Sequence, residues 1–161
     1  MLAALIFLFA VHAPAEDAWD CDYTPRTPAE TSGDREYIVL DDGTAEITCY
    51  DDRQVDVPEI PSQLDGYTVT GIGNDAISCY YELTSVTIPD SVTVIGDWAF
   101  QYCTGFTSVT IPNSVTSIGE KAFAMYFDRS EELVFTVDEG SYAEEYCKTN
   151  GCMYRYPGEA N

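Results

Sequence analysis

The side chains of this 161-residue chain that could do chemistry are six cysteines and 28 acidic residues, accompanied by one histidine. That histidine, His12, follows an apolar N-terminal run, so the rest of the chain offers no imidazole for Ser-His-Asp or Cys-His catalysis. Paired carboxylates remain as a route to hydrolysis, but they must face each other across a cleft with separated pKa values. We therefore expect a protein that is not an enzyme and holds no cofactor.

Neither the cysteines nor the aspartates form a recognisable metal site. The six cysteines contain no Cys-x-x-Cys pair, the spacing typical of zinc sites. Two groups of aspartates lack the twelve-residue, helix-flanked ligand pattern of a calcium loop: Asp20 and Asp22, and Asp51, Asp52 and Asp56. We interpret them as solvated acids and predict no bound metal.

The N-terminus has the pattern of an export signal. Residues 2–11 are all apolar, and Ala13 and Ala15 follow with the small-x-small spacing that signal peptidases accept. The run is about half as long as the roughly 20 residues that a membrane-spanning helix requires. Although no basic residue precedes it, we predict a signal peptide over residues 1–15. The mature protein is expected to be secreted or held at the cell surface, without inserting into the membrane.

The charge balance argues against two classes of partner. The chain has 28 acidic and 7 basic residues, a net charge of -21, and no Lys or Arg between Arg53 and Lys121. Nucleic acids and anionic membranes are bound mainly by Lys and Arg that neutralise phosphate. We expect neither partner, and we interpret the acidity as a source of solubility.

A repeat of 23 residues dominates the middle of the chain. The pattern Val-Thr-x-Ile-Gly recurs at 69–73, 92–96 and 115–119, and Thr-Ser-Val-Thr-Ile-Pro recurs at 84–89 and 107–112. Such repeats are typical of solenoids, in which one unit cannot cover its own apolar residues and stacked neighbours bury them together. Two buried columns are expected: Val69, Val92 and Val115, and Ile77, Phe100 and Phe123.

Each unit is expected to contribute one strand. In residues 83–88, Val86 and Ile88 alternate with Ser85 and Thr87, the pattern of a strand with one buried and one exposed face. The proline that follows cannot donate to a strand ladder, so the strand should end there. Glycines are expected to permit a tight bend in each unit, at a place where a side chain would clash; these are Gly73, Gly96 and Gly119.

These repeats resemble the BspA-like leucine-rich repeats. The run Leu-Thr-Ser-Val-Thr-Ile-Pro-x-Ser-Val-Thr-x-Ile-Gly-x-x-Ala-Phe, which starts at Leu83, is similar to the 23-residue unit of that family, and the similarity extends over residues 57–151. The resemblance implies a mainly β repeat solenoid, a right-handed stack of coils, in a secreted or cell-surface protein used for adhesion. Because only two to three full coils fit into residues 57–137, we expect a short solenoid.

Two segments precede the repeats. Residues 16–34 are mostly polar and show no sustained periodicity, so we expect a flexible acidic leader. In residues 35–56, the runs 37–40 and 44–49 flank the polar turn Asp41-Asp42-Gly43. This arrangement predicts a β-hairpin that caps the N-terminal end of the solenoid.

The segment after the repeats, residues 138–161, is expected to be a C-terminal cap with a short helix at 142–149. Ser141 and Glu144 have the spacing of a capping box, and Asn150-Gly151 supplies a C-terminal stop.

Six cysteines in an exported chain are compatible with up to three disulfides, whose pairing the sequence does not decide. Cys147 and Cys152 would close a small loop across the end of the predicted helix. Cys21 and Cys49 would tie the leader to the hairpin. We predict these two bridges.

The remaining cysteines, Cys79 and Cys103, lie one residue off the repeat period. Adjacent coils are close enough for a bridge between them, and buried thiols are an equal alternative. The resemblance implies a thiol at Cys103, because the family's repeats commonly have a packed cysteine there.

The exposed positions of the predicted strands are the candidates for binding. Ser85, Thr87, Ser108 and Thr110 are expected to line up on the exposed face of the sheet, the kind of surface that repeat proteins use for recognition. With the adhesion that the resemblance implies, this predicts a monomeric extracellular module that binds a protein or a glycan. The alternatives are an inert spacer, or fragment of a longer repeat protein, and a carboxylate-based hydrolase.

Overall fold

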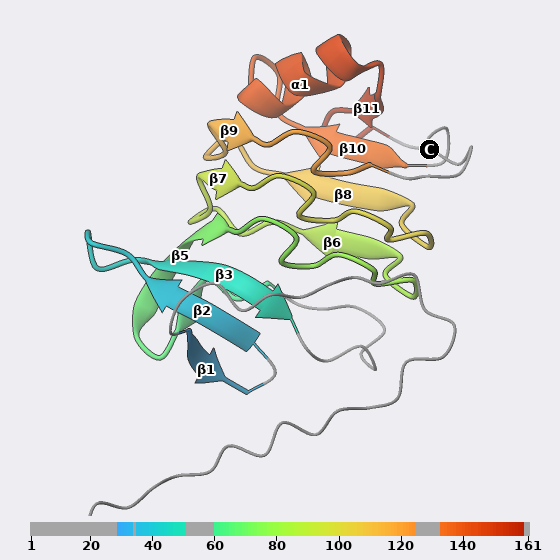
Figure 1. The fold of residues 1–161 in the computed structure, drawn as a ribbon. Helices are drawn as coiled ribbons and strands as arrows, with labels where there is room; N and C mark the ends of the chain where they lie inside the picture. The colour runs from blue at the N-terminus through green and yellow to red at the C-terminus, as the bar shows by residue number, and fades with distance from the viewer. Residues whose placement is uncertain (1–28, 34, 51–59, 125–132, 160–161) are drawn as a thin grey trace, which may run out of the picture.

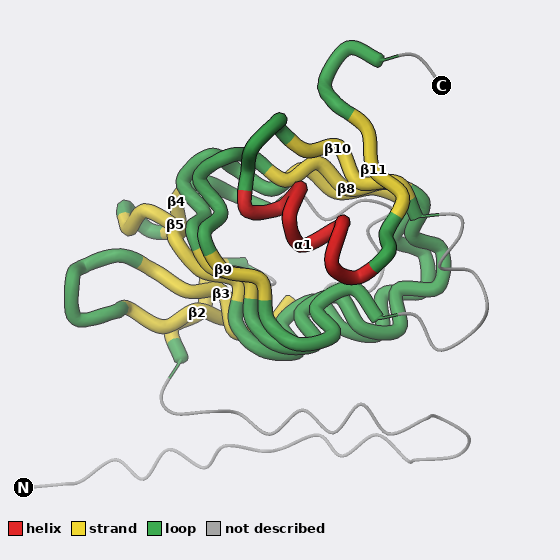
Figure 2. Tube along the Cα trace, turned by 90° about the horizontal axis from the view of Figure 1, so that it is seen from above, coloured by secondary structure: helices red, strands yellow, loops and turns green. Residues whose placement is uncertain are grey.

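The computed structural model describes residues 29–33, 35–50, 60–124 and 133–159. Their short strands form two sheets on opposite sides of a stack of coils, and helix α1 (Tyr142–Asn150) closes one end of the stack (Figure 1). Seen along the stack, the coils superimpose as a ring, and α1 lies across its middle (Figure 2). The architecture is the mainly β repeat solenoid that the sequence predicts.

The larger sheet has seven strands, in the order β1-β2-β3-β5-β7-β9 with β4 beside β5. Their bounds are β1 (Glu30–Ser32), β2 (Arg35–Val39), β3 (Ala45–Tyr50), β4 (Gln63–Leu64), β5 (Tyr67–Ile72), β7 (Val94–Ile95) and β9 (Ser117–Ile118). From β3 to β9 the neighbours are parallel, and each contributes one isoleucine to a buried column in register: Ile47, Ile72, Ile95 and Ile118.

The smaller sheet is parallel throughout, in the order β11-β10-β8-β6. Its strands are β6 (Ser85–Thr87), β8 (Ser108–Ile111), β10 (Val134–Val137) and β11 (Met153–Arg155). Val86, Val109 and Phe135 lie in register and are buried, whereas their neighbours along each strand face outward. This confirms the alternation predicted for β6 and β8.

The two predicted core columns are also confirmed, since all six of their members are buried. Phe100 and Phe123 stack with ring centroids 5.1 Å apart and planes 4° from parallel. Helix α1 begins after Ser141, whose side chain accepts a hydrogen bond from Glu144 N, and it ends at Gly151 in the left-handed conformation. Within the described residues, no helix is long and apolar enough to cross a membrane.

Three expectations need correction. Each unit contributes two strands rather than one, because β7 and β9 have two residues each and are too short to show alternation in the sequence. Each sheet holds four parallel strands, more than two to three coils imply, because β3 of the predicted hairpin and β11 after the helix join the stack. Strand β1 pairs with β2 although it lies in the segment expected to be a flexible leader. The predicted signal peptide lies outside the described residues.

Candidate binding surface

The exposed face of the smaller sheet brings the four predicted binding residues together. In the parallel register, Ser85 lies beside Ser108 and Thr87 lies beside Thr110. Thr87 and Thr110 are exposed, and the two serines are half-buried. Since neighbouring strands of a sheet are about 4.8 Å apart, equivalent hydroxyl groups form closely spaced rows.

The same register extends both rows onto β10 and β11. The threonine row consists of Thr87, Thr110, Thr136 and Arg155, and the serine row consists of Ser85, Ser108, Val134 and Met153. We call these eight residues the hydroxyl face.

The hydroxyl groups of the four predicted residues differ from other threonine hydroxyls of the coils. Thr107 Oγ1 donates to Thr84 O at 3.0 Å, and Thr116 Oγ1 donates to Thr93 O at 3.3 Å, so these hydroxyls serve contacts between coils. In the described part of the chain, the four predicted residues make no such side-chain bond. Their capacity to donate and accept hydrogen bonds is therefore directed at solvent, as recognition of a partner requires.

Strand β11 adds a cation, Arg155, to one edge of the hydroxyl face. Arg155 Nε donates a hydrogen bond to Thr136 Oγ1 at 3.2 Å. The sequence analysis missed Arg155 because it predicted no strand after the helix, whereas β11 follows α1. The available signal was a short alternation, since Tyr154 packs against the core while Met153 before it is 46% exposed.

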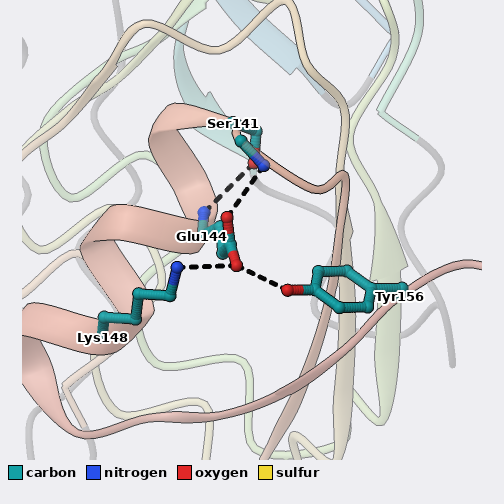
Figure 3. A network of polar contacts seen from close by, with 5 residues as sticks. Ser141, Glu144, Lys148 and Tyr156 are labelled. Carbon is teal, nitrogen blue, oxygen red and sulfur yellow. Dashed lines mark hydrogen bonds and ion pairs between the residues drawn. The ribbon is translucent and has the colours of Figure 1, made fainter.

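Glu144 links α1 to the chain that leaves β11 (Figure 3). Its carboxylate accepts hydrogen bonds from Gly140 N at 2.8 Å and from the Tyr156 hydroxyl at 2.6 Å, and it pairs with Lys148 Nζ at 2.8 Å. The bond with Lys148, followed by those from Tyr156 and Gly140, lowers the pKa of Glu144 to about 2. Because Tyr156 directly follows β11, this network holds one edge of the hydroxyl face against the helix.

The structure does not contain the two predicted disulfides, because Cys49, Cys147 and Cys152 are thiols. Cys49 lies on β3 opposite Glu36 of β2, inside the hairpin ladder, and its predicted partner Cys21 lies outside the described residues. Cys147 and Cys152 nevertheless lie close together at the end of α1, where Cys152 N donates a hydrogen bond to Cys147 O at 2.9 Å.

Cys103 is a buried thiol, as the resemblance implies, and its Sγ donates to Ile77 O at 3.2 Å. Burial raises the pKa of Cys103 to about 12. Because Cys103 is a thiol, the bridge between Cys79 and Cys103 that the sequence left open is absent. Cys79 itself is disulfide-bonded. Cys79 occupies a left-handed corner position with φ 64°, and Tyr102 occupies the same position one unit later with φ 61°.

Within the described residues, no group of three or more His, Cys, Asp or Glu side chains is placed to hold a metal ion. The chemistry that the surface offers is hydrogen bonding by neutral hydroxyls, with one guanidinium at the edge.

Two sheets of short parallel strands that recur every 23 residues around buried apolar columns define a leucine-rich-repeat solenoid. Residues 62–147 match the family model of the BspA type leucine rich repeat region, in six copies. The chain belongs to this family.

Solved structures of leucine-rich repeat proteins are similar to the chain, and two of them are at least 30% identical to it. A leucine-rich repeat protein from Bacteroides capillosus is 30% identical with a TM-score of 0.57, and the match covers 70% of this chain and 88% of that one. A leucine rich cell surface protein from Faecalibacterium prausnitzii is 33% identical with a TM-score of 0.57, over 76% of this chain and 35% of that one. The chain thus spans about a third of the second protein. No curated protein matches the chain at a significant level.

Proposed function

We propose that this protein is a non-catalytic interaction module that binds an extracellular protein through its hydroxyl face. The observation that carries the proposal is the alignment of four hydroxyl-bearing residues on the outer face of β6 and β8, namely Ser85, Thr87, Ser108 and Thr110. Repeat proteins recognise partners on such faces because stacking places equivalent side chains at regular intervals along an extended surface.

The composition of the hydroxyl face favours a protein partner over a glycan. None of its eight residues is aromatic, whereas flat aromatic rings supply the stacking surface that sugar rings need. Rows of hydroxyls suit the amide and carbonyl groups of a polypeptide, and Arg155 at the edge suits an acidic side chain. A net charge of -21 disfavours nucleic acid as the partner.

The proposed place of action is outside the cell. The apolar run at residues 2–11 followed by Ala13 and Ala15 supports export, and the similar Faecalibacterium prausnitzii protein is described as a cell surface protein. A mature chain that begins near Glu16, found in the medium or on intact cells, is the expected result of N-terminal sequencing. Full-length chain confined to the cytosol would contradict export.

Binding is tested on an array of extracellular matrix proteins and glycans. Thr87→Arg and Thr110→Arg place bulky charges on the hydroxyl face, and Ser117→Arg places the same charge at an exposed position of β9 in the other sheet. Saturable binding to a protein that falls at least tenfold in both face variants, but not in the β9 control, is the expected outcome. Binding to glycans alone, or an equal loss in the control, would contradict the proposal.

A spacer without a ligand of its own is the second candidate. The observation that favours it is length, because the match covers only 35% of the Faecalibacterium prausnitzii chain. In that case the folded protein binds nothing on the array, and the three arginine variants are indistinguishable from the unsubstituted chain.

A further inference from the structure

The end of helix α1 brings two thiols together. Gly151 follows the helix with φ 69°, and Cys152 N donates to Cys147 O at 2.9 Å. This is the Schellman arrangement, in which the residue after the glycine packs against a residue in the last turn of the helix. That contact is commonly hydrophobic, but here it joins Cys147 to Cys152, and the short backbone bond keeps the two residues within the reach of a disulfide.

The two thiols lie in different environments. Cys147 is fully buried in the core, whereas Cys152 is half-buried and lines a cavity of about 810 Å³ beside Phe123 and Tyr146. The interaction with the neighbouring thiol raises the pKa of Cys147, with burial adding to the effect, and it lowers the pKa of Cys152. Cys152 is therefore both the more reachable sulfur and the one that more readily becomes a thiolate.

We propose that Cys147 and Cys152 form an oxidative modification site, which a small-molecule disulfide converts into an intramolecular bridge. The Cys152 thiolate attacks one sulfur of the oxidant, breaks its S–S bond and releases one thiolate, which leaves a mixed disulfide on Cys152. The Cys147 sulfur then attacks Cys152 Sγ, which forms the protein disulfide and expels the second thiolate, and the proton of Cys147 passes to that departing thiolate. Two electrons and two protons pass from the protein to the oxidant, which leaves as two thiols.

The bridge has a structural consequence at the hydroxyl face. Cys152 directly precedes β11, so a bond to Cys147 ties α1 covalently to the strand that carries Arg155. It closes a loop of six residues, from Cys147 to Cys152. Since a loop of this size restricts the unfolded chain modestly, oxidation is expected to raise the melting temperature by roughly 4 to 8 °C.

The test uses the full chain, folded and treated with oxidised glutathione, followed by alkylation and peptide mapping without reduction. A peptide that links residues 147 and 152, two hydrogens lighter than its reduced form, is the expected product. Cys103 serves as an internal control, because it is buried and bonded to Ile77 O and should remain a thiol throughout. Recovery of Cys147 and Cys152 as thiols, or of a lasting glutathione adduct on Cys152, would overturn the proposal.

Two variants test the order of attack. Cys147→Ser removes the thiol that completes the bridge, so a glutathione adduct should accumulate on Cys152. Cys152→Ser should leave Cys147 unmodified, because burial shields it. An adduct on Cys147 in the second variant, with circular dichroism unchanged, would contradict the assigned roles. The mapping of the unsubstituted chain decides whether the bridge forms even if a variant fails to fold, and it does not depend on whether the hydroxyl face binds a partner.

Discussion

Asn74 and Asp97 occupy the same position in successive coils, and Asn74 Oδ1 accepts a hydrogen bond from Asp97 N at 2.8 Å. One coil later, Asp97 Oδ1 accepts from Glu120 N at 2.7 Å. Each side chain therefore satisfies a backbone donor just beyond strands β7 and β9, where the sheet ladder has ended. The column holds the corners of the coils in register.

Asp97→Ala removes the acceptor for Glu120 N. We expect the free energy of unfolding to fall by about 1 kcal/mol in urea titrations, because a backbone donor loses its partner. Asp97→Asn keeps an acceptor oxygen and should remain close to the unsubstituted protein. The matched control is Asp90→Ala at an exposed turn. An equal loss in Asp97→Asn would assign the effect to charge rather than to the hydrogen bond.

Gly119→Ala should force two coils apart. A Cβ at this position would lie 2.5 Å from Asp97 N and 2.5 Å from Gly96 C, which are backbone atoms of the preceding coil and cannot rotate away. We expect destabilisation of about 1–3 kcal/mol, as for overpacking in a dense core. Thermal melting checks this, with Ser117→Ala on exposed β9 as the control. An unchanged melting temperature would mean that the coils separate at little cost.

Lys121→Gly should stabilise the protein. Lys121 is exposed and has φ 53°, a left-handed conformation that costs about 1–2 kcal/mol for a residue with a Cβ. Its ion pair with Glu120 lies at the surface and contributes little. After the entropy that glycine loses on folding is subtracted, we expect a gain of about 0.5–1 kcal/mol in unfolding free energy. Lys121→Ala removes the same ion pair and keeps the strained φ, so it should show no gain.

Glu144→Gln should reduce the loss of folding stability that occurs as the pH falls below about 4.5. The pKa of Glu144 falls from its ordinary value of 4.5 to about 2 in the folded protein. The stabilisation is therefore complete above about pH 4.5 and is lost as the pH falls towards 2, because the unfolded chain binds the proton first. Melting temperatures between pH 6 and pH 2 should fall more steeply for the unsubstituted chain than for the variant. Glu145→Gln, on the exposed side of α1, should keep the steep slope.

The repeat strands that were predicted correctly depend on the period of the sequence. Alternation placed Val86 inward and Thr87 outward, and the 23-residue spacing placed Thr87 beside Thr110, so the sequence could predict the centre of the hydroxyl face. Arg155 could not be found in this way, because β11 has no counterpart in the repeat and joins β10 only after α1 has crossed the end of the stack.

The glycines show a second limit of sequence reasoning. Gly96 and Gly119 were expected to permit tight bends where side chains would clash, and the clash is confirmed, but the left-handed residues are Trp98 and Lys121, two positions later. Both glycines are required because the backbone of the preceding coil lies where a Cβ would be. A glycine can be required because its φ is positive or because a neighbouring coil leaves no room for a Cβ. The distance between coils decides which applies, and that distance is defined only in the folded stack.

The 23-residue register makes the length of this protein adjustable. Backbone and side-chain bonds between coils join residues one unit apart, as in Thr107 to Thr84 and Thr116 to Thr93. Insertion of a further copy of residues 90–112 after Pro112 would lengthen each sheet by one strand, about 4.8 Å. The hairpin and α1 would keep their own neighbours, while the hydroxyl face would gain one serine and one threonine.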